Sequence, residues 1–338
     1  MILRSETVEQ TIDGGRRGTF VKDVVMTPGQ PIGMVRKRRV GPGPTRGAVL
    51  LIHGFGQNRY AWHISRRSFS AYLAESGWDV FNVDLRGHGR SSAFDGRRPE
   101  VLDEYIHEDL PACVDEAARL SGHEQVALIG HSMGGIVSYC AAATALRGRV
   151  RALGSIGSPY RFGEGHVALK ALRGVLHAVR ATGALDSNPT LPMRWLGRHL
   201  KRRKRVWDSR LLPTPVRAWR PGAVEDEVLD EYLEAAFEPT HLGIAFDIFA
   251  GGDRIVLRSD DRALDYGAAF EALDVPLMVI AGDEDDLAPP ASVRPAFERS
   301  GSRDKHYRVF PFGHADLIIG REAPTTVWPA LGEFLGRR

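Results

Sequence analysis

Residues 125–135 read QVALIGHSMGG, and the fold is decided in this stretch. Its first half is an apolar run typical of a strand buried on both faces of a parallel sheet. The small-residue stretch IVSYCAAATAL follows as an expected helix. Between them, GHSMG at 130–134 fits the pattern GxSxG, in which a serine occupies a tight strand-to-helix turn and flanking glycines admit neighbouring backbone. The pattern predicts Ser132 as a nucleophile, and a chance match in a glycine-rich chain is the alternative.

Other apolar runs indicate more strands of the same sheet. They are AVLLIHGFG at 48–56, WDVFNVDLRGHG at 78–89, PLMVIAGDEDD at 276–286 and HYRVFPFGHADL at 306–317. Helix-length patterns at 68–76 and 102–120 alternate with the runs at 48–56, 78–89 and 125–135. This alternation predicts an α/β protein with an open, doubly wound, mostly parallel sheet. Segments 19–26 and 32–39, around a Pro-Gly turn, predict an antiparallel hairpin at the sheet edge.

Between residues 159 and 274 the pattern changes to short helical pieces with proline, tryptophan and charge. We interpret this stretch as a mainly helical cap inserted over the carboxyl ends of the strands. Residues 1–158 and 275–338 would then form the core domain.

The composition is that of an ordinary soluble protein, with 338 residues, 43% hydrophobic and 26% charged. A net charge of +3 singles out neither nucleic acid nor membrane as the partner. Cys113 and Cys140 are too few for a disulfide framework and are expected to be buried, reduced thiols. No apolar run has the length of a signal peptide or membrane span, so we expect a soluble cytoplasmic protein.

A serine hydroxyl needs a base near neutral pH, and histidine is the natural one. Of twelve histidines, His314 follows the last predicted strand, at the sheet edge where Ser132 also lies. His306 begins that strand at the opposite edge, and His131 adjoins the nucleophile. His314 is therefore the predicted base, with a surface-loop histidine as the alternative.

The acid that orients this base should lie between Ser132 and His314 in the chain. The loop GDEDDLAPP at 282–290 follows a buried strand and offers four carboxylates. An acid there would accept the imidazole N–H and stabilise the imidazolium. The pattern alone does not choose among the four.

In order along the chain, HGFG, DLRGHGRS, GHSMGG, GDEDD with LAPP, and FGHAD resemble the α/β-hydrolase superfamily of serine hydrolases, esterases and lipases. The resemblance covers residues 48–160 and 275–335. A weaker one, in SFSAYLAESGWDVFNVDLRGHGRS, is to acid lipases and polyhydroxyalkanoate synthase-like proteins. The superfamily resemblance implies the α/β-hydrolase fold and a reaction that needs no cofactor and no metal.

The same resemblance implies roles for individual residues. The form GxxDxxxP, with Gly282 and Pro289, places the acid at Asp285, while Asp283 and Asp286 stay as alternatives. The backbone amides of Phe55 and Met133 would form the oxyanion hole.

Serine at the elbow departs from polyester synthases, which carry cysteine, and from epoxide hydrolases, which carry aspartate. The expected function is therefore cleavage of small carboxylic esters through an acyl-enzyme, as in lipases and esterases. An acyltransferase or thioesterase with the same triad is one alternative. A non-catalytic ligand-binding protein on this fold is another.

The expected cap is electrically split. Residues 160–220 hold 14 lysines and arginines against 3 acids, and residues 221–239 hold 7 acids and no base. One hypothesis is that the segment 192–207, with KRRKR at 201–205, contacts a lipid surface through Trp195 and Trp207. The alternative is a solvated helix whose charges pair with the acidic segment. No nucleic-acid-binding motif accompanies the basic run, so nucleic acid is not an expected partner, and the oligomeric state stays open.

Overall fold

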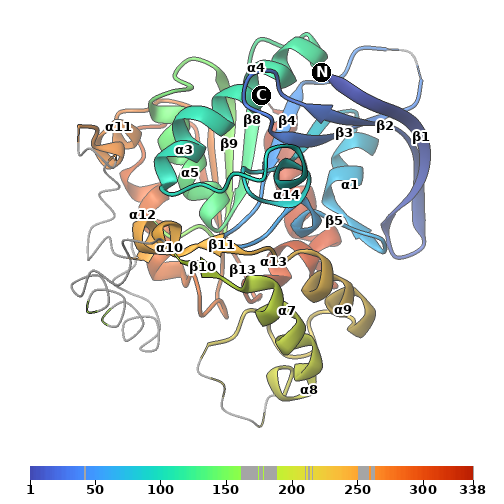
Figure 1. The fold of residues 1–338 in the computed structure, drawn as a ribbon, viewed down its shortest axis with the longest axis vertical. Helices are drawn as coiled ribbons and strands as arrows, with labels where there is room; N and C mark the ends of the chain where they lie inside the picture. Colours follow the sequence, from blue (N-terminus) through green and yellow to red (C-terminus); the bar gives the residue numbers. More distant parts are fainter. Residues whose placement is uncertain are drawn as a thin grey trace.

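The structure is a computed structural model, and it describes residues 1–41, 43–160, 174, 178, 189–209, 211, 214, 216–249, 259 and 263–337. An 11-stranded sheet crosses it in the order β13-β12-β9-β8-β4-β7-β3-β2-β1-β6-β5 (Figure 1). The parallel strands are β4 (Ala48–Ile52), β7 (Asp79–Asp84), β8 (Val126–His131), β9 (Val150–Ile156), β12 (Leu277–Gly282) and β13 (Lys305–Phe310). The antiparallel strands are β1 (Ile2–Asp13), β2 (Arg16–Met26), β3 (Gly33–Arg39), β5 (His63–Ile64) and β6 (Arg67–Ser68). This confirms the predicted mostly parallel α/β sheet.

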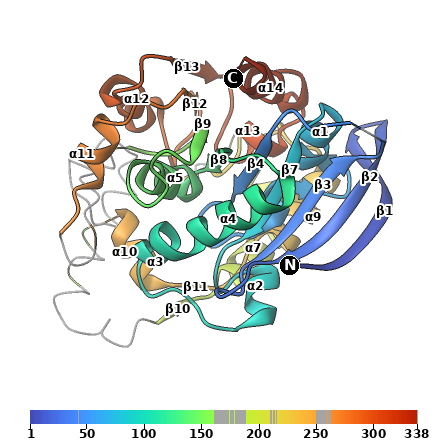
Figure 2. The same cartoon turned by 90° about the horizontal axis from the view of Figure 1, so that it is seen from above.

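The chain winds to both sides of β4, because β7 and β8 are its two neighbours in the sheet. The connection through α1 (Phe69–Glu75) covers one face and the connection through α4 (Leu110–Ser121) covers the other (Figure 2). The face of α4 also carries α5 (Met133–Ala143), α11 (Tyr266–Glu271) and α12 (Pro290–Arg299). The face of α1 carries α13 (Asp316–Ile319) and α14 (Val327–Gly336).

Residues of β4 show why its sequence is apolar throughout. Leu50 and Ile52 join the core under α4 and α5, whereas Val49 and Leu51 join the core under α1 and α14. Since both faces of the strand are buried, neither set of alternate residues is polar.

Two local features differ from the prediction. The predicted hairpin is present as β2 and β3 but does not form the sheet edge, because β1 pairs with the outer side of β2 and the sheet continues through β6 and β5. The helix predicted at 102–120 is divided into α3 (Leu102–Glu104), a π-helical turn (Tyr105–Asp109) and α4. The buried side chain of Arg86 binds Glu104, Glu108 and Asp109, so this turn gathers three carboxylates around one guanidinium.

The region expected to be a cap contributes mostly helices in its described parts. They are α7 (Met193–Arg202), α8 (Lys204–Trp207), α9 (Asp226–Ala235) and α10 (Leu242–Phe249), with the short strands β10 (Thr190–Leu191) and β11 (Thr240–His241). Helix α11 also falls within the predicted bounds of the cap, but it packs against α5 of the core. Helices α7, α8 and α9 lie together at the bottom of Figure 1. Much of 161–188 and 250–262 lies outside the described residues, so the predicted cap boundaries, 159 and 274, stay a prediction. Three short helical elements complete the list: α2 (Gly89–Phe94) and the 3-10 turns Arg59–Ala61 and Ala323–Thr325.

Neither cysteine forms a disulfide, and both Cys113 and Cys140 are buried, as expected. Among the helices of the described chain, none is both long and apolar enough to cross a membrane.

Lys37 is an unusual core residue, because its side chain is buried between β3 and α1. Its Nζ donates to Ser70 Oγ at 3.1 Å, and Ser70 Oγ in turn lies 3.1 Å from Ser68 Oγ. Within the described residues no carboxylate pairs with it. Burial, with a smaller contribution from Lys22, lowers the pKa of Lys37 from 10.5 to about 7.

We expect the substitution Lys37→Met to raise the free energy of unfolding by roughly 3–5 kcal/mol at pH 7. The unfolded amine binds its proton below pH 10.5 and the folded amine only below about 7, so the wild type gains stability as pH rises between these values. The advantage of the variant should therefore be complete below pH 7 and shrink above it. Urea unfolding from pH 6 to 10 measures it.

Lys22→Met is the matched control, because Lys22 faces Lys37 across the β2–β3 pairing but is solvent-accessible and paired with Glu6. It should change stability by no more than about 0.5 kcal/mol. A Lys37→Met gain that did not vary with pH would contradict a titrating buried amine.

Candidate active site

Ser132 occupies the turn between β8 and α5. Its φ of 54° and ψ of −121° make it the one non-glycine residue of the described chain with a positive φ. Its amide donates to Ile156 O of the neighbouring strand β9 at 3.0 Å, which holds the turn against the sheet. A non-glycine residue in such a conformation costs free energy and persists only where its surroundings fix it.

The surroundings are fixed by close backbone contacts. A Cβ on Gly130 would lie 2.3 Å from the backbone of Gly134, and one on Gly134 would lie 2.2 Å from Ile52 O. Only glycine permits either approach. The GxSxG spacing thus lets helix α5 start directly over the strand that it leaves and against the end of β4.

His314 and Asp285 form a buried pair, with 7% and 2% of their surfaces exposed. His314 Nδ1 lies 2.7 Å from Asp285 Oδ2. The other carboxylate oxygen, Oδ1, accepts the amide protons of Leu287 and Ala288 at 2.9 and 2.8 Å. An ionised carboxylate accepts only, so Nδ1 carries the proton and Nε2 is left as the acceptor nitrogen of the imidazole. Gly157 gives the pair room, since a Cβ there would lie 3.2 Å from Nδ1.

The other three acids of the 282–290 loop are directed elsewhere. Asp283 and Glu284 are exposed, and Asp286 accepts the amide proton of Arg217 at 2.9 Å. Of the four carboxylates that the sequence offered, the structure therefore places Asp285 against His314. The catalytic roles of these residues stay a prediction.

His131 brings the elbow and His314 together. Its ring centroid lies 4.5 Å from that of His314, and its Nε2 lies 3.2 Å from His314 O. Burial and the neighbouring His314 hold the pKa of His131 well below its usual range, so it stays neutral and donates from Nε2. Sequence reasoning set His131 aside, although its place next to Ser132 was the available signal.

The HGFG loop after β4 passes over Ser132. A Cβ on Gly54 would lie only 3.2 Å from Ser132 Cβ. Met133 is the first residue of α5, so its amide has no partner inside the helix. Phe55 follows Gly54 and is half-buried. The two predicted oxyanion donors are thus on the two segments that meet at Ser132.

His53 braces this loop. Its Nδ1 donates to Gly54 O at 2.9 Å and its Nε2 accepts the Leu85 amide proton at 3.1 Å. Burial, with His88 nearby, lowers the pKa of His53 to about 3. A neutral His53 therefore connects the loops that follow β4 and β7.

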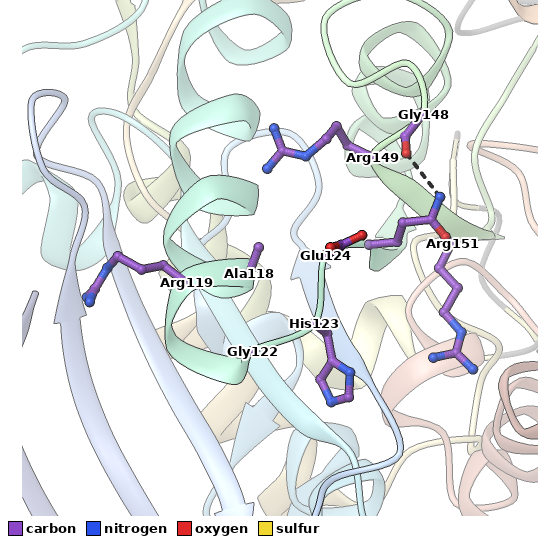
Figure 3. A pocket seen from close by; sticks show the side chains of 9 residues that line it. Ala118, Arg119, Gly122, His123, Glu124, Gly148, Arg149 and Arg151 are labelled. Carbon is purple, nitrogen blue, oxygen red and sulfur yellow. Dashed lines mark hydrogen bonds between the residues drawn. The ribbon is translucent and has the colours of Figure 1, made fainter.

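A groove of about 970 Å³ lies elsewhere on the molecule (Figure 3). Its lining includes Arg119, His123 and Arg149, near the amino ends of β8 and β9. Ser132 follows the carboxyl end of β8, so this groove is at the opposite edge of the sheet. Within the described residues, no group of three or more histidine, cysteine or acidic side chains is arranged to hold a metal ion.

Comparison with known proteins agrees with this architecture. Residues 47–193 match the family model described as the alpha/beta hydrolase fold. The solved structure of the Paleococcus ferrophilus monoacylglycerol lipase superposes with a TM-score of 0.62 at 18% identity, covering 90% of this chain and 98% of that one.

Three curated relatives differ in chemistry and coverage. Bifunctional epoxide hydrolase 2 of Sus scrofa is 35% identical over 139 residues, which cover 40% of this chain but 22% of that protein. The poly(3-hydroxyalkanoate) polymerase subunit PhaC of Haloferax mediterranei is 22% identical, covering 86% and 58%. The monoacylglycerol lipase of Mycolicibacterium smegmatis is 28% identical, covering 79% and 80%. The chain thus spans less than two thirds of the first two, and it is an α/β-hydrolase-fold protein similar to esterases and lipases.

Proposed function

We propose that this protein is a serine hydrolase that cleaves small carboxylic esters through an acyl-enzyme on Ser132. The observation that carries the proposal is the buried His314–Asp285 hydrogen bond of 2.7 Å beside a strained serine elbow. A histidine held this way has a fixed tautomer and an acceptor nitrogen, which are the requirements for a general base.

In the proposed reaction, Ser132 Oγ attacks the ester carbonyl while His314 Nε2 takes its proton. The oxyanion of the tetrahedral intermediate is stabilised by the amides of Met133 and Phe55, each worth on the order of 3 kcal/mol. Collapse expels the alcohol, which receives the proton from His314. Water then attacks the acyl-enzyme with His314 again as base, the bond from the acyl carbon to Ser132 Oγ breaks, and His314 returns the proton to Oγ as the carboxylic acid leaves. Asp285 stays ionised throughout and stabilises the imidazolium.

The residue at the elbow supports esters over the other chemistries that the relatives represent. Coverage alone does not separate them, because monoacylglycerol lipase matches 79% of this chain and Epoxide hydrolase B of Mycobacterium tuberculosis matches 74% of it. The position that carries aspartate in epoxide hydrolases and cysteine in polyester synthases carries Ser132 here. Lipase- or esterase-like activity follows as the proposal.

The cap segment suggests a second part of the proposal, which concerns a lipid partner. Four basic residues of α7 and α8 pair with acids in or just after α9, which agrees with the alternative of a solvated helix whose charges pair with the acidic segment. These pairs join Arg194 to Glu238, Arg198 and Lys201 to Glu234, and Lys204 to Asp226 and Asp230.

The remaining arginines at the end of α7 and in α8 have a different character. Arg202, Arg203 and Arg205 are exposed and form no ion pair with a described residue, and Trp195 of α7, about two helical turns before Arg202, is 61% exposed. Trp207, by contrast, is half-buried against the core, so it does not belong to this surface. We call Trp195 with the three arginines the outer cap face. It combines positive charge with an aromatic ring, which suits an anionic lipid surface.

Helix α7, which carries Trp195 and Arg202 of the outer cap face, also contacts the candidate site. Met193, at the start of α7, packs on Gly56 of the HGFG loop, where a Cβ would lie 2.7 Å from Met193 Cγ. The amide of Glu238 donates to Gly56 O at 2.8 Å. Docking through this face would therefore hold the oxyanion loop near the lipid.

We expect the purified protein to hydrolyse p-nitrophenyl esters, with an optimum between acetate and palmitate that reports the size of the acyl pocket. Ser132→Ala should lower kcat by about 10³-fold or more, and Asp285→Asn by about 10³ to 10⁴-fold, because the base loses its orienting acceptor. Release of p-nitrophenol measures both.

Asp286→Asn is the matched control, because this neighbouring carboxylate binds Arg217 rather than His314. It should retain most of the activity. Equal loss in both acid variants would argue against Asp285 as the specific partner. A wild type that a serine-directed phosphonate does not label, and that cleaves no ester, would favour a non-catalytic binder. Labelling with transfer only to thiol or alcohol acceptors would favour the acyltransferase or thioesterase alternative.

The lipid partner is tested with vesicles of phosphatidylcholine with and without phosphatidylglycerol. Changing Arg202, Arg203 and Arg205 to Gln together should weaken binding to the anionic vesicles by about a hundredfold, at about 1 kcal/mol per arginine. High salt should weaken wild-type binding likewise. Co-sedimentation measures the effect.

The charge-matched control changes Arg39, Arg46 and Arg147 to Gln. This removes the same charge at exposed positions by the amino ends of β7, β4 and β9, at the sheet edge opposite Ser132. It should leave vesicle binding near the wild-type value. Equal weakening by the two triple variants would rule out a specific outer cap face. A wild-type protein that binds duplex DNA but not the vesicles would indicate a nucleic-acid partner instead.

A further inference from the structure

Asp316 is a fully buried carboxylate two residues after His314, at the start of α13. Its Oδ2 accepts the amide protons of Gly313 at 2.9 Å and of Arg220 at 2.8 Å. Its Oδ1 is buried and has no hydrogen-bond partner among the described residues. Burial raises the pKa of Asp316 to about 6, partly opposed by those two amides. A half-satisfied buried carboxylate is costly, so its presence calls for a role other than core packing.

The Arg220 amide belongs to a segment of four residues, 217–220, which we call the strap. Besides the Arg220 bond to Asp316, Ala218 O accepts the Ala315 amide proton at 2.8 Å. At its other end, Arg217 donates its amide proton to Asp286. The strap is thus hydrogen-bonded both to the loop that carries Asp285 and to the loop that carries His314.

The strap lies directly on the His314 loop. A Cβ on Gly313 would lie 2.8 Å from Arg220 N and 2.9 Å from the carbonyl carbon of Trp219. Asp316 follows His314 and accepts the amide proton of Gly313, which precedes it, so this bond closes a turn around the histidine. The same oxygen also joins the turn to Arg220 of the strap. Without an acceptor at this point, the amides of Gly313 and Arg220 would lose their partner, and the Ala315–Ala218 bond would remain between the loop and the strap.

We infer that Asp316 is a positioning residue for His314: by accepting the Gly313 and Arg220 amide protons through Oδ2, it holds the imidazole against Asp285. It acts through the backbone and touches neither the reacting atoms nor Ser132. The kinetic part of this inference rests on the proposed ester hydrolysis, whereas the geometric part does not.

The test compares Asp316→Asn, Asp316→Ala and Asp316→Leu. Asparagine keeps an acceptor oxygen for both amides, alanine removes it and leaves a cavity, and leucine removes it at nearly constant volume. Alanine and leucine should lower kcat and the rate of phosphonate labelling of Ser132 by on the order of tenfold or more with little change in KM, because the imidazole is misplaced. Asparagine should restore both rates to within about threefold of wild type.

Asp208→Ala is the matched control. Asp208 Oδ1 also accepts two N–H groups in the same region, from Trp219 Nε1 at 3.1 Å and Gly222 N at 2.8 Å, but it contacts neither candidate catalytic loop. It should lower thermal stability without a comparable fall in kcat. Loss of kcat equal to that of Asp316→Ala would mean that any weakening of this region suffices, and would overturn the inference.

A readout that does not depend on catalysis separates the two proposals. The His314 Nδ1 proton, bonded to Asp285, should give a low-field proton resonance that is absent in Asp285→Ala. We expect Asp316→Leu to broaden or abolish it and Asp316→Asn to keep it. This result in a protein that cleaves no ester would uphold the positioning role while the proposed function fails. An unchanged resonance in a folded alanine or leucine variant, or an asparagine variant as impaired as leucine, would overturn the inference.

Discussion

The left-handed backbone of Ser132 is the constraint around which the rest of the candidate site is arranged. At a φ of 54° the serine leaves the direction of β8 at once, and helix α5 must then start over the strand. That path exists only because residues 130 and 134 are glycines. A Cβ at either position would lie 2.2–2.3 Å from neighbouring backbone atoms. The contact of Gly134 with Ile52 O also joins the elbow to the end of β4, from which the HGFG loop departs. Strain at one residue is therefore coupled to the placement of a loop that is remote in sequence.

Around the elbow the chain buries titratable groups in defined protonation states. His53 and His131 are neutral, and each uses one ring nitrogen as a donor to a backbone carbonyl, so both act as braces. Asp285 differs, because its carboxylate receives two backbone amides besides the imidazole of His314. Only His314 among these three histidines has a carboxylate partner, and this difference in environment, not residue type, marks it as the candidate base.

The sequence predicted those features that depend on local pattern. Ser132 follows β8, whose apolar run is unbroken, whereas His314 follows β13, an edge strand with the sequence KHYRVF and no fully buried residue. Parallel strands bring their carboxyl ends to one edge of a sheet, so the strand pattern sufficed to place both residues at that edge. The acid was different. Four carboxylates stand in succession at 283–286, and only backbone hydrogen bonds of the folded loop distinguish Asp285, so resemblance to a family had to choose it. Asp316, Lys37 and the strap could not be predicted at all, because their partners are distant: Arg220 and Asp316 are 96 residues apart.

The described parts of the cap are bonded to the candidate loops at two separate places. Through Met193 and Glu238 they contact Gly56 of the HGFG loop, and through the strap they contact the loops of Asp285 and His314. The first attachment is to a loop that precedes Ser132 in the sequence, and the second is to loops that follow it. Helices α7 and α9 are held to each other by the ion pairs of Arg198 and Lys201 with Glu234. A shift of these helices and the strap as a body would therefore disturb the loop that carries Phe55 and the loops that carry Asp285 and His314 together. The described parts of the expected cap thus belong to the frame that holds the candidate site, and their sequence is constrained by that frame.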